Sequence, residues 1–114
     1  MCLVLKDEEL FLATGSPGGS RIITSVLQVI LNVIDHKMSI REAVAAPRIH
    51  HQWLPDTLYV EEEAGEGLAA ALRKKGYEVK RTGPIGSTQS VAKINGIFHG
   101  AADPRHSGGL AQGY

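Results

Sequence analysis

The chain has 114 residues, which is enough for one domain with a moderate hydrophobic core. Twelve basic and twelve acidic residues cancel, so no excess of charge points to nucleic acid or to an anionic membrane as a partner. The chain has one cysteine, Cys2, which excludes an internal disulfide. An export signal is not predicted within the chain, because it contains no charged segment followed by an apolar run. The composition therefore indicates a small globular unit.

The first predicted elements are a hairpin and a long helix. Apolar residues 3–5 and 10–13 flank a short charged segment and predict two paired strands. From Ser20 to His36, polar residues recur every three or four positions on an otherwise apolar cylinder, which predicts a mostly buried helix. The helix is too short and too interrupted to cross a bilayer.

Between the hairpin and the helix lies a glycine-rich turn. Pro17 fixes φ, while Gly18 and Gly19 can adopt backbone angles that are closed to other residues. Because a helix follows, the N–H groups of the Gly pair and the positive end of the helix dipole face the same way. Such a turn can hold a bound anion, or an oxyanion that develops during acyl transfer. The alternative is that the glycines only let the chain bend tightly. No Gly-Lys-Ser/Thr follows, which excludes a nucleotide P-loop.

The middle of the chain predicts a short helix and a strand. Ser39 and Glu42 form a capping box, and Pro47 ends the helix that they begin. A polar and aromatic loop over residues 48–55 then leads to a strand at residues 57–60.

The second half predicts one more helix and three strands. Acidic residues at positions 61–66 and basic residues at 73–75 bracket an Ala/Leu-rich helix and match its dipole at both ends. Residues 77–81 alternate as a strand does, and two further strands at 87–94 and 97–101 flank the hairpin turn Asn95-Gly96. The predicted order is β-β-α-α-β-α-β-β-β. This is an α+β fold, mainly antiparallel, with helices covering a sheet.

Residues 14–23 resemble the Gly-Gly segment of the γ-glutamyltransferases (γ-glutamyl transpeptidases), which are N-terminal-nucleophile hydrolases. The resemblance continues in the family's order over nearly the whole chain, through residues 27–35, 42–48, 50–56, 86–90, 102–105 and 113–114. The form His50-His51-Gln52-Trp53 is similar to bacterial members. The resemblance implies that residues 1–114 are a single domain, the C-terminal portion of a small subunit. It also implies that the chain supplies about half of an α-β-β-α sandwich.

The resemblance also implies a chemistry. In this family a precursor cuts itself in two, and a newly exposed threonine attacks γ-glutamyl amides such as glutathione, passing the γ-glutamyl group to an amino acid, a peptide or water. That threonine and the groups that bind the donor would lie upstream of these residues. The N–H groups of Gly18 and Gly19 would form the oxyanion hole. The substrate-binding residues stay unknown, and neither a metal nor a cofactor is expected.

The expected partners are the upstream part of the same enzyme, glutathione or another γ-glutamyl substrate, and further copies of the chain through exposed apolar surface. Nucleic acid and membrane are not expected. The full-length family is periplasmic or secreted, but any signal would lie upstream, so the location of this chain stays unknown. Two other functions remain open. One is part of a related acylase or of a capsule-processing relative, and the other is a non-catalytic anion-binding or assembly module.

Other residues suggest chemistry less strongly. Removal of Met1 would give Cys2 a thiol beside a free amino group, but the resemblance places Cys2 inside a strand. His50 and His51 are adjacent in a loop without a third ligand at helical spacing, so backbone-bonded loop histidines are favoured over a metal site.

The glycine-rich tail holds the remaining candidates. Asp103, His106 and Ser107 superficially form a hydrolytic triad, but residues so close in sequence rarely reach triad geometry. We expect Arg105 to anchor the C-terminal tail through an ion pair, with a place in the subunit contact as the alternative. Trp53 is expected to be a packing anchor for its loop, and the wall of a substrate cleft is the alternative.

Overall fold

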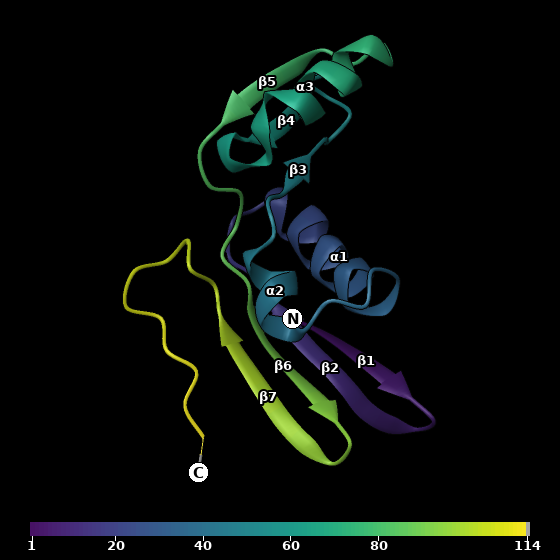
Figure 1. The fold of residues 1–114 in the computed structure, drawn as a ribbon, viewed down its shortest axis with the longest axis vertical. Coiled ribbons are helices and arrows are strands. Elements are labelled where there is room, and N and C mark those ends of the chain that lie inside the picture. The colour runs from purple at the N-terminus through teal and green to yellow at the C-terminus, as the bar shows by residue number, and fades with distance from the viewer. Residues whose placement is uncertain (114) are drawn as a thin grey trace.

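The computed structural model describes residues 1–113, and Tyr114, the last residue of the resemblance, lies outside them. The chain measures 45 × 32 × 25 Å and is built on two sheets, one above the other in Figure 1. The larger sheet has the strand order β1-β2-β6-β7 and is antiparallel throughout. Its strands are β1 (Cys2–Lys6), β2 (Glu9–Gly15), β6 (Gln89–Ile94) and β7 (Ile97–Ala102).

The smaller sheet has the order β3-β4-β5, with strands β3 (Ile49–His50), β4 (Leu58–Glu61) and β5 (Val79–Thr82). Strands β3 and β4 are antiparallel, whereas β4 and β5 are parallel. A parallel pair needs a crossover, and η1 (Glu62–Ala64) followed by α3 (Gly65–Lys74) supplies it. From β5, residues 83–88 return the chain to the larger sheet.

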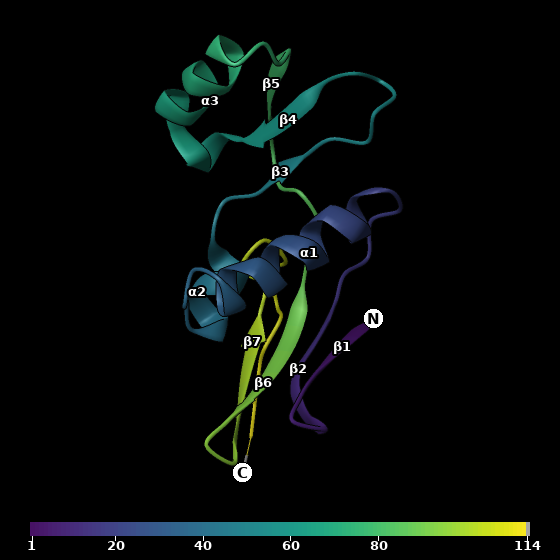
Figure 2. The ribbon, with the colours of Figure 1, turned by 90° about the vertical axis from the view of Figure 1, so that its right-hand side faces the viewer.

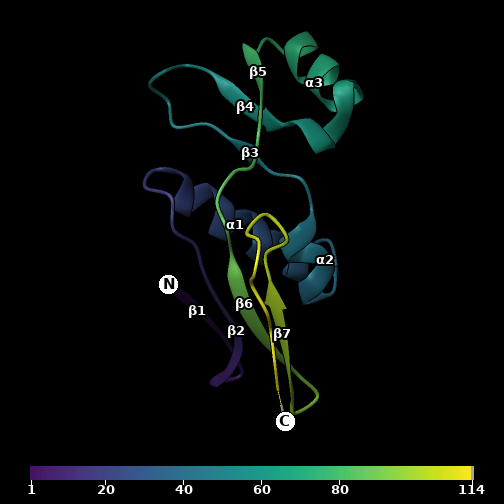
Figure 3. The same cartoon turned by 90° about the vertical axis from the view of Figure 1, so that its left-hand side faces the viewer.

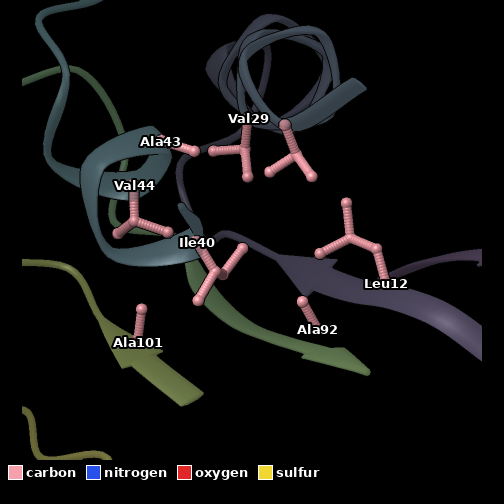
Figure 4. Close-up of a cluster of buried hydrophobic side chains, with 8 residues drawn as sticks. Leu12, Val29, Ile40, Ala43, Val44, Ala92 and Ala101 are labelled. Atoms are coloured by element: carbon pink, nitrogen blue, oxygen red, sulfur yellow. The ribbon is translucent and has the colours of Figure 1, made fainter. Parts of the chain in front are cut away.

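Helices α1 (Arg21–Ile34) and α2 (Ile40–Ala45) lie on one face of the four-stranded sheet (Figure 2). The N–H of Glu42 donates to the Ser39 hydroxyl at 3.2 Å, which confirms that half of the predicted capping box. Buried side chains from both helices meet those of the sheet in one hydrophobic core (Figure 4), formed by Leu12, Val29, Val33, Ile40, Ala43, Val44, Ala92 and Ala101. This core fixes the position of α1 relative to the end of β2.

Helix α1 is not mostly buried, so that prediction is wrong for the chain on its own. Its polar side chains face inward: the Gln28 amide bonds both the N–H and the C=O of Ile49, at 2.9 and 2.7 Å. Its apolar side chains Ile23 and Leu27 are 75% and 50% exposed, and Leu31 and Ile34 are exposed as well. A surface helix normally shows the reverse pattern. The described part of the chain covers only one side of α1.

The α+β class and the mainly antiparallel pairing are confirmed, whereas three details differ from the prediction. The strands form two sheets rather than one, and β3 lies within the predicted loop. Glu61 ends β4 instead of opening a helix, because its carboxylate is held by buried hydrogen bonds.

The C-terminal segment turns back after β7 and runs beside that strand (Figure 3). A Cβ on Gly100 in β7 would lie 3.1 Å from the Cβ of Ala111, so this segment packs closely against the strand. Within residues 1–113, no helix has the length and apolar character needed to cross a membrane.

Candidate functional site

The Gly-Gly turn, residues 15–20, joins β2 to α1 and is exposed at its tip. Gly18 has a φ of +126° and Gly19 a φ of +58°. L side chains rarely adopt these angles, so the structure confirms that both positions use the conformational freedom of glycine. This requirement alone would satisfy the interpretation that the glycines only bend the chain. Whether the turn can also bind an anion depends on where its N–H groups point.

The peptide group between Gly18 and Gly19 points its N–H bond away from α1. The N–H of Arg21 donates to the C=O of Gly18 and that of Ile22 to the C=O of Gly19, both at 3.1 Å. In a trans peptide the C=O and the following N–H point in opposite directions. Because the Gly18 C=O is directed toward the helix, the Gly19 N–H points outward. Within residues 1–113, neither the Gly18 N–H nor the Gly19 N–H meets an acceptor.

The N-terminal side of the turn is held by a serine. The Ser16 hydroxyl donates to the C=O of Pro17 at 2.7 Å and accepts from the N–H of Ser87 at 3.0 Å. The turn therefore rests against residues 85–88, which lead into β6.

The C-terminal side is held by a chain of polar side chains. The Ser20 hydroxyl donates to Gln52 Oε1 at 2.9 Å, so it does not cap α1. His50 Nε2 lies 3.0 Å from the same oxygen, and Thr24 Oγ1 lies 2.6 Å from His50 Nδ1. Because the Gln52 amide nitrogen donates to Leu54, its oxygen is the acceptor and His50 Nε2 must carry a proton.

The expectation of loop histidines bonded to the backbone is met by His51 and not by His50. His50 lies in β3, is buried, and uses side chains rather than the backbone as partners. His51 is in the loop, where its Nδ1 accepts from the Trp53 N–H and its Nε2 pairs with Asp56, both at 3.0 Å. No three His, Cys, Asp or Glu side chains within residues 1–113 gather as metal ligands. Trp53 itself is 77% exposed, so the expectation of a packing anchor is wrong within this chain.

Four charged side chains form a buried ionic network that holds residues 85–88, the segment that contacts the turn. Arg105 bonds both carboxylate oxygens of Glu61, at 2.6 and 2.7 Å, and also reaches Asp103 at 3.1 Å. Arg48 pairs with Asp103 at 2.8 Å and donates to Thr88 at 2.7 Å. All four charged side chains are less than a tenth exposed. The network links the segment before β3, the last residue of β4 and the segment after β7.

Both carboxylates of this network have a pKa below the ordinary value for their type. Burial by itself raises the pKa of Glu61, but hydrogen bonds from Arg105 and from the N–H groups of Ile85 and Arg48 bring it below its ordinary value. The pKa of Asp103 is lowered against the same effect of burial, by the N–H groups of Arg105 and Thr88 and by the Arg48 side chain. Burial and the like charge of Arg105 lower the pKa of Arg48.

The contacts of the network test the predictions made for the residues of the C-terminal tail. Arg105 anchors the C-terminal segment through ion pairs, as expected. The carboxylate of Asp103 is occupied by Arg48, Arg105 and Thr88, which leaves no triad with His106 and Ser107. Cys2 pairs with Thr14 inside the β1–β2 ladder, where the resemblance had placed it.

Four residues that support the turn or belong to the ionic network were not predicted from the sequence: Ser16, Arg48, Glu61 and Thr88. One local signal could have indicated the network: arginine and aspartate stand beside proline in Pro47-Arg48 and in Asp103-Pro104-Arg105. Because proline stiffens the backbone, such segments can hold a buried charge in place. Nothing local marks Ser16 or Thr88, whose partners lie 71 and 15 residues away.

The class of protein follows from the fold. A solved γ-glutamyltranspeptidase from Helicobacter pylori, a T380A mutant, matches with a TM-score of 0.86 and 45% sequence identity. The match covers 92% of this chain and 59% of that one. The fold is thus that of an N-terminal-nucleophile hydrolase, which confirms the predicted class.

The family model described as Gamma-glutamyltranspeptidase matches residues 1–113, and the chain belongs to this enzyme family. The chain is 48% identical to the glutathione hydrolase proenzyme of Escherichia coli K12 over 113 residues, which are 98% of this chain and 20% of that protein. It is 38% identical to an acylase ACY 1 proenzyme of Pseudomonas sp. SE83, over 96% of this chain and 21% of that protein. The chain spans about a fifth of these curated relatives.

Proposed function

We propose that this chain supplies the oxyanion hole of an enzyme that cleaves γ-glutamyl amides such as glutathione, with Gly18 and Gly19 as the backbone donors. The observation that carries the proposal is the pair of exposed N–H groups without an acceptor within residues 1–113. They sit at the start of α1, where the helix dipole adds positive potential. The family and the name of the E. coli relative support the substrate class.

The donors act when negative charge develops. A nucleophilic hydroxyl attacks the γ-carbonyl carbon, its proton goes to a base, and the carbonyl oxygen becomes an oxyanion that accepts from both N–H groups. When this intermediate collapses, the base gives the proton to the leaving nitrogen, the C–N bond breaks, and the amine is released with a γ-glutamyl ester left on the enzyme. An amine or water then attacks the ester carbonyl through a second oxyanion in the same place, which gives transfer or hydrolysis.

We propose that the nucleophile comes from the part of the enzyme that precedes the matched segment in the relatives. The threonines near the turn are engaged: Thr14 bonds Ser90 at 2.7 Å, and Thr88 belongs to the ionic network. The same upstream part is the proposed partner of the apolar face of α1, which carries Ile23 and Leu27. The relatives are named as proenzymes, which fits an enzyme assembled from two parts of one polypeptide.

The test replaces the matched segment of the E. coli proenzyme with residues 1–114 of this chain; we call this protein the grafted enzyme. We expect it to mature and to release the amine from a γ-glutamyl anilide, whereas the 114-residue chain alone shows no turnover. Gly19→Pro removes one N–H and should lower kcat of the grafted enzyme by at least about 100-fold. Gly83→Ala is the matched control, because its added Cβ meets open space. Near-normal turnover by Gly19→Pro would assign the glycines to bending alone.

A second candidate function is the turn of a related acylase, which the likeness to the Pseudomonas acylase favours. The same oxyanion hole would serve any amide whose acyl group fits the upstream pocket. Assembly of this chain with the upstream part of the acylase, followed by assay on a β-lactam side-chain amide, separates the two. Binding without turnover in both assemblies would instead support a non-catalytic module.

A further inference from the structure

We infer that Ser16 is a positioning residue that aims the Gly18 N–H, and that Gly86 and Ser87 hold Ser16 in place. This inference rests on the proposed function of the Gly-Gly turn and names the residues that set its geometry.

The peptide group between Pro17 and Gly18 is oriented by a side chain. Its C=O accepts from the Ser16 hydroxyl at 2.7 Å. Because the C=O and the N–H of one trans peptide point in opposite directions, this bond also sets the direction of the Gly18 N–H. The Gly19 N–H is set differently, by the bond from Arg21 to the Gly18 C=O. Of the two proposed donors, only that of Gly18 depends on a side chain for its direction.

The Ser16 hydroxyl is itself held from across the fold. It accepts from the N–H of Ser87 at 3.0 Å, which turns its proton toward Pro17. Ser87 belongs to a segment fixed on both sides by the ionic network. Ile85 donates to Glu61 at 2.6 Å and accepts from Arg48 at 2.9 Å, while the Thr88 N–H donates to Asp103 at 2.7 Å. Residues 86 and 87 are therefore a short bridge between two buried anchors.

Gly86 is required for this bridge on two grounds. Its φ of +69° is a conformation that L side chains rarely adopt. A Cβ there would also overlap the Ser25 hydroxyl and lie 3.0 Å from Ser16 Oγ. The Ser25 hydroxyl is buried and has no hydrogen-bond partner within residues 1–113, so nothing but close packing holds it against Gly86. A side chain at position 86 would displace the atom that aims the Gly18 N–H.

The grafted enzyme tests the inference with three variants. Ser16→Ala removes both hydrogen bonds, and we expect kcat to fall between about 10- and 100-fold, because a misdirected donor loses much of the effect of a deleted one. KM should stay within about twofold, since the oxyanion exists only near the transition state. Ser16→Thr keeps the hydroxyl and should recover most of kcat. Gly86→Ala should lower kcat in the same way, whereas Gly83→Ala, three residues away in open space, should not.

Maturation and the circular dichroism spectrum separate misfolding from misdirection. A Ser16→Ala enzyme that matures normally and keeps kcat within twofold of the parent overturns the inference while leaving the proposed function intact. If Ser16→Thr is as slow as Ser16→Ala, the hydroxyl is not the operative group and the inference is again wrong.

An inactive parent graft would count against the proposed function, and the inference is then judged by NMR on the 114-residue chain carrying Ile23→Gln and Leu27→Gln, which should keep it monomeric. In Ser16→Ala, the Ser87 amide should exchange faster with solvent and the Gly18 amide resonance should shift, while Gly83→Ala changes neither. Unchanged Ser87 and Gly18 amides in Ser16→Ala would overturn the inference without reference to activity.

Discussion

Arg105 offers the sharpest test of the ionic network. Its guanidinium makes five hydrogen bonds, to Glu61, Asp103 and the carbonyls of Val44 and Ala46. Arg105→Met removes all five and leaves the carboxylate of Glu61, 4% exposed, with only two backbone N–H donors. Removing one partner of a buried ion pair costs about 3–5 kcal/mol. Because a domain of this size is stable by roughly 5–15 kcal/mol, the variant should lose a large share of its stability.

Urea unfolding followed by far-ultraviolet circular dichroism measures this loss. Trp53 fluorescence is a poor probe, because its side chain is already exposed in the folded chain. The surface arginine Arg73, which pairs with the exposed Glu66, is the matched control. Arg73→Met removes a charge and an ion pair of the same type, but water replaces the lost partner, so its unfolding midpoint should change far less.

A double variant identifies the cause of the loss. If the cost comes from a buried carboxylate without its cation, Arg105→Met combined with Glu61→Gln should be more stable than Arg105→Met alone, because glutamine buries no charge. The reasoning is refuted if Arg105→Met is no less stable than Arg73→Met. It is also refuted if Glu61→Gln lowers the free energy of unfolding of the Arg105→Met variant by as much as it lowers that of the parent chain.

Three further predictions concern acidity, packing and association. The pKa values of Glu61 and Asp103 are lowered in the folded chain, so these carboxylates stabilise the fold above the pKa of unfolded carboxyls, about 4. The free energy of unfolding should therefore fall as the pH drops below that value. A urea series from pH 7 to pH 2.5 that shows no such fall would contradict the assignment. Ser25→Ala removes a buried hydroxyl without a partner and should raise the free energy of unfolding by about 1 kcal/mol, whereas a lower urea midpoint would show that the hydroxyl has a partner. The isolated chain should self-associate and bind a hydrophobic dye, and Ile23→Gln with Leu27→Gln should reduce both in sedimentation velocity; a sharply melting monomer that ignores the dye would show that the chain is self-sufficient.

The sequence by itself determined the features that depend on neighbouring residues. Glycines at positions 18 and 19 after a proline predicted a turn with backbone angles that L side chains rarely adopt, and φ values of +126° and +58° confirm it. The hairpin turn at Asn95-Gly96 and the Ser39 cap followed from the same local chemistry. The family could also be predicted, because its motifs keep their order along the chain.

Only the tertiary structure decided how distant segments support the turn. Glu61 looked like the acidic start of a helix, and its role depends on Arg105, 44 residues away. Ser16 carries no local signal, because the group that orients it is a backbone N–H 71 residues further along the chain. The spacing of the polar residues predicted that α1 is buried on nearly all sides, yet Gln28 faces inward and Ile23 faces out. Periodicity shows that a helix has two unlike faces, but only the packed elements determine which face is covered.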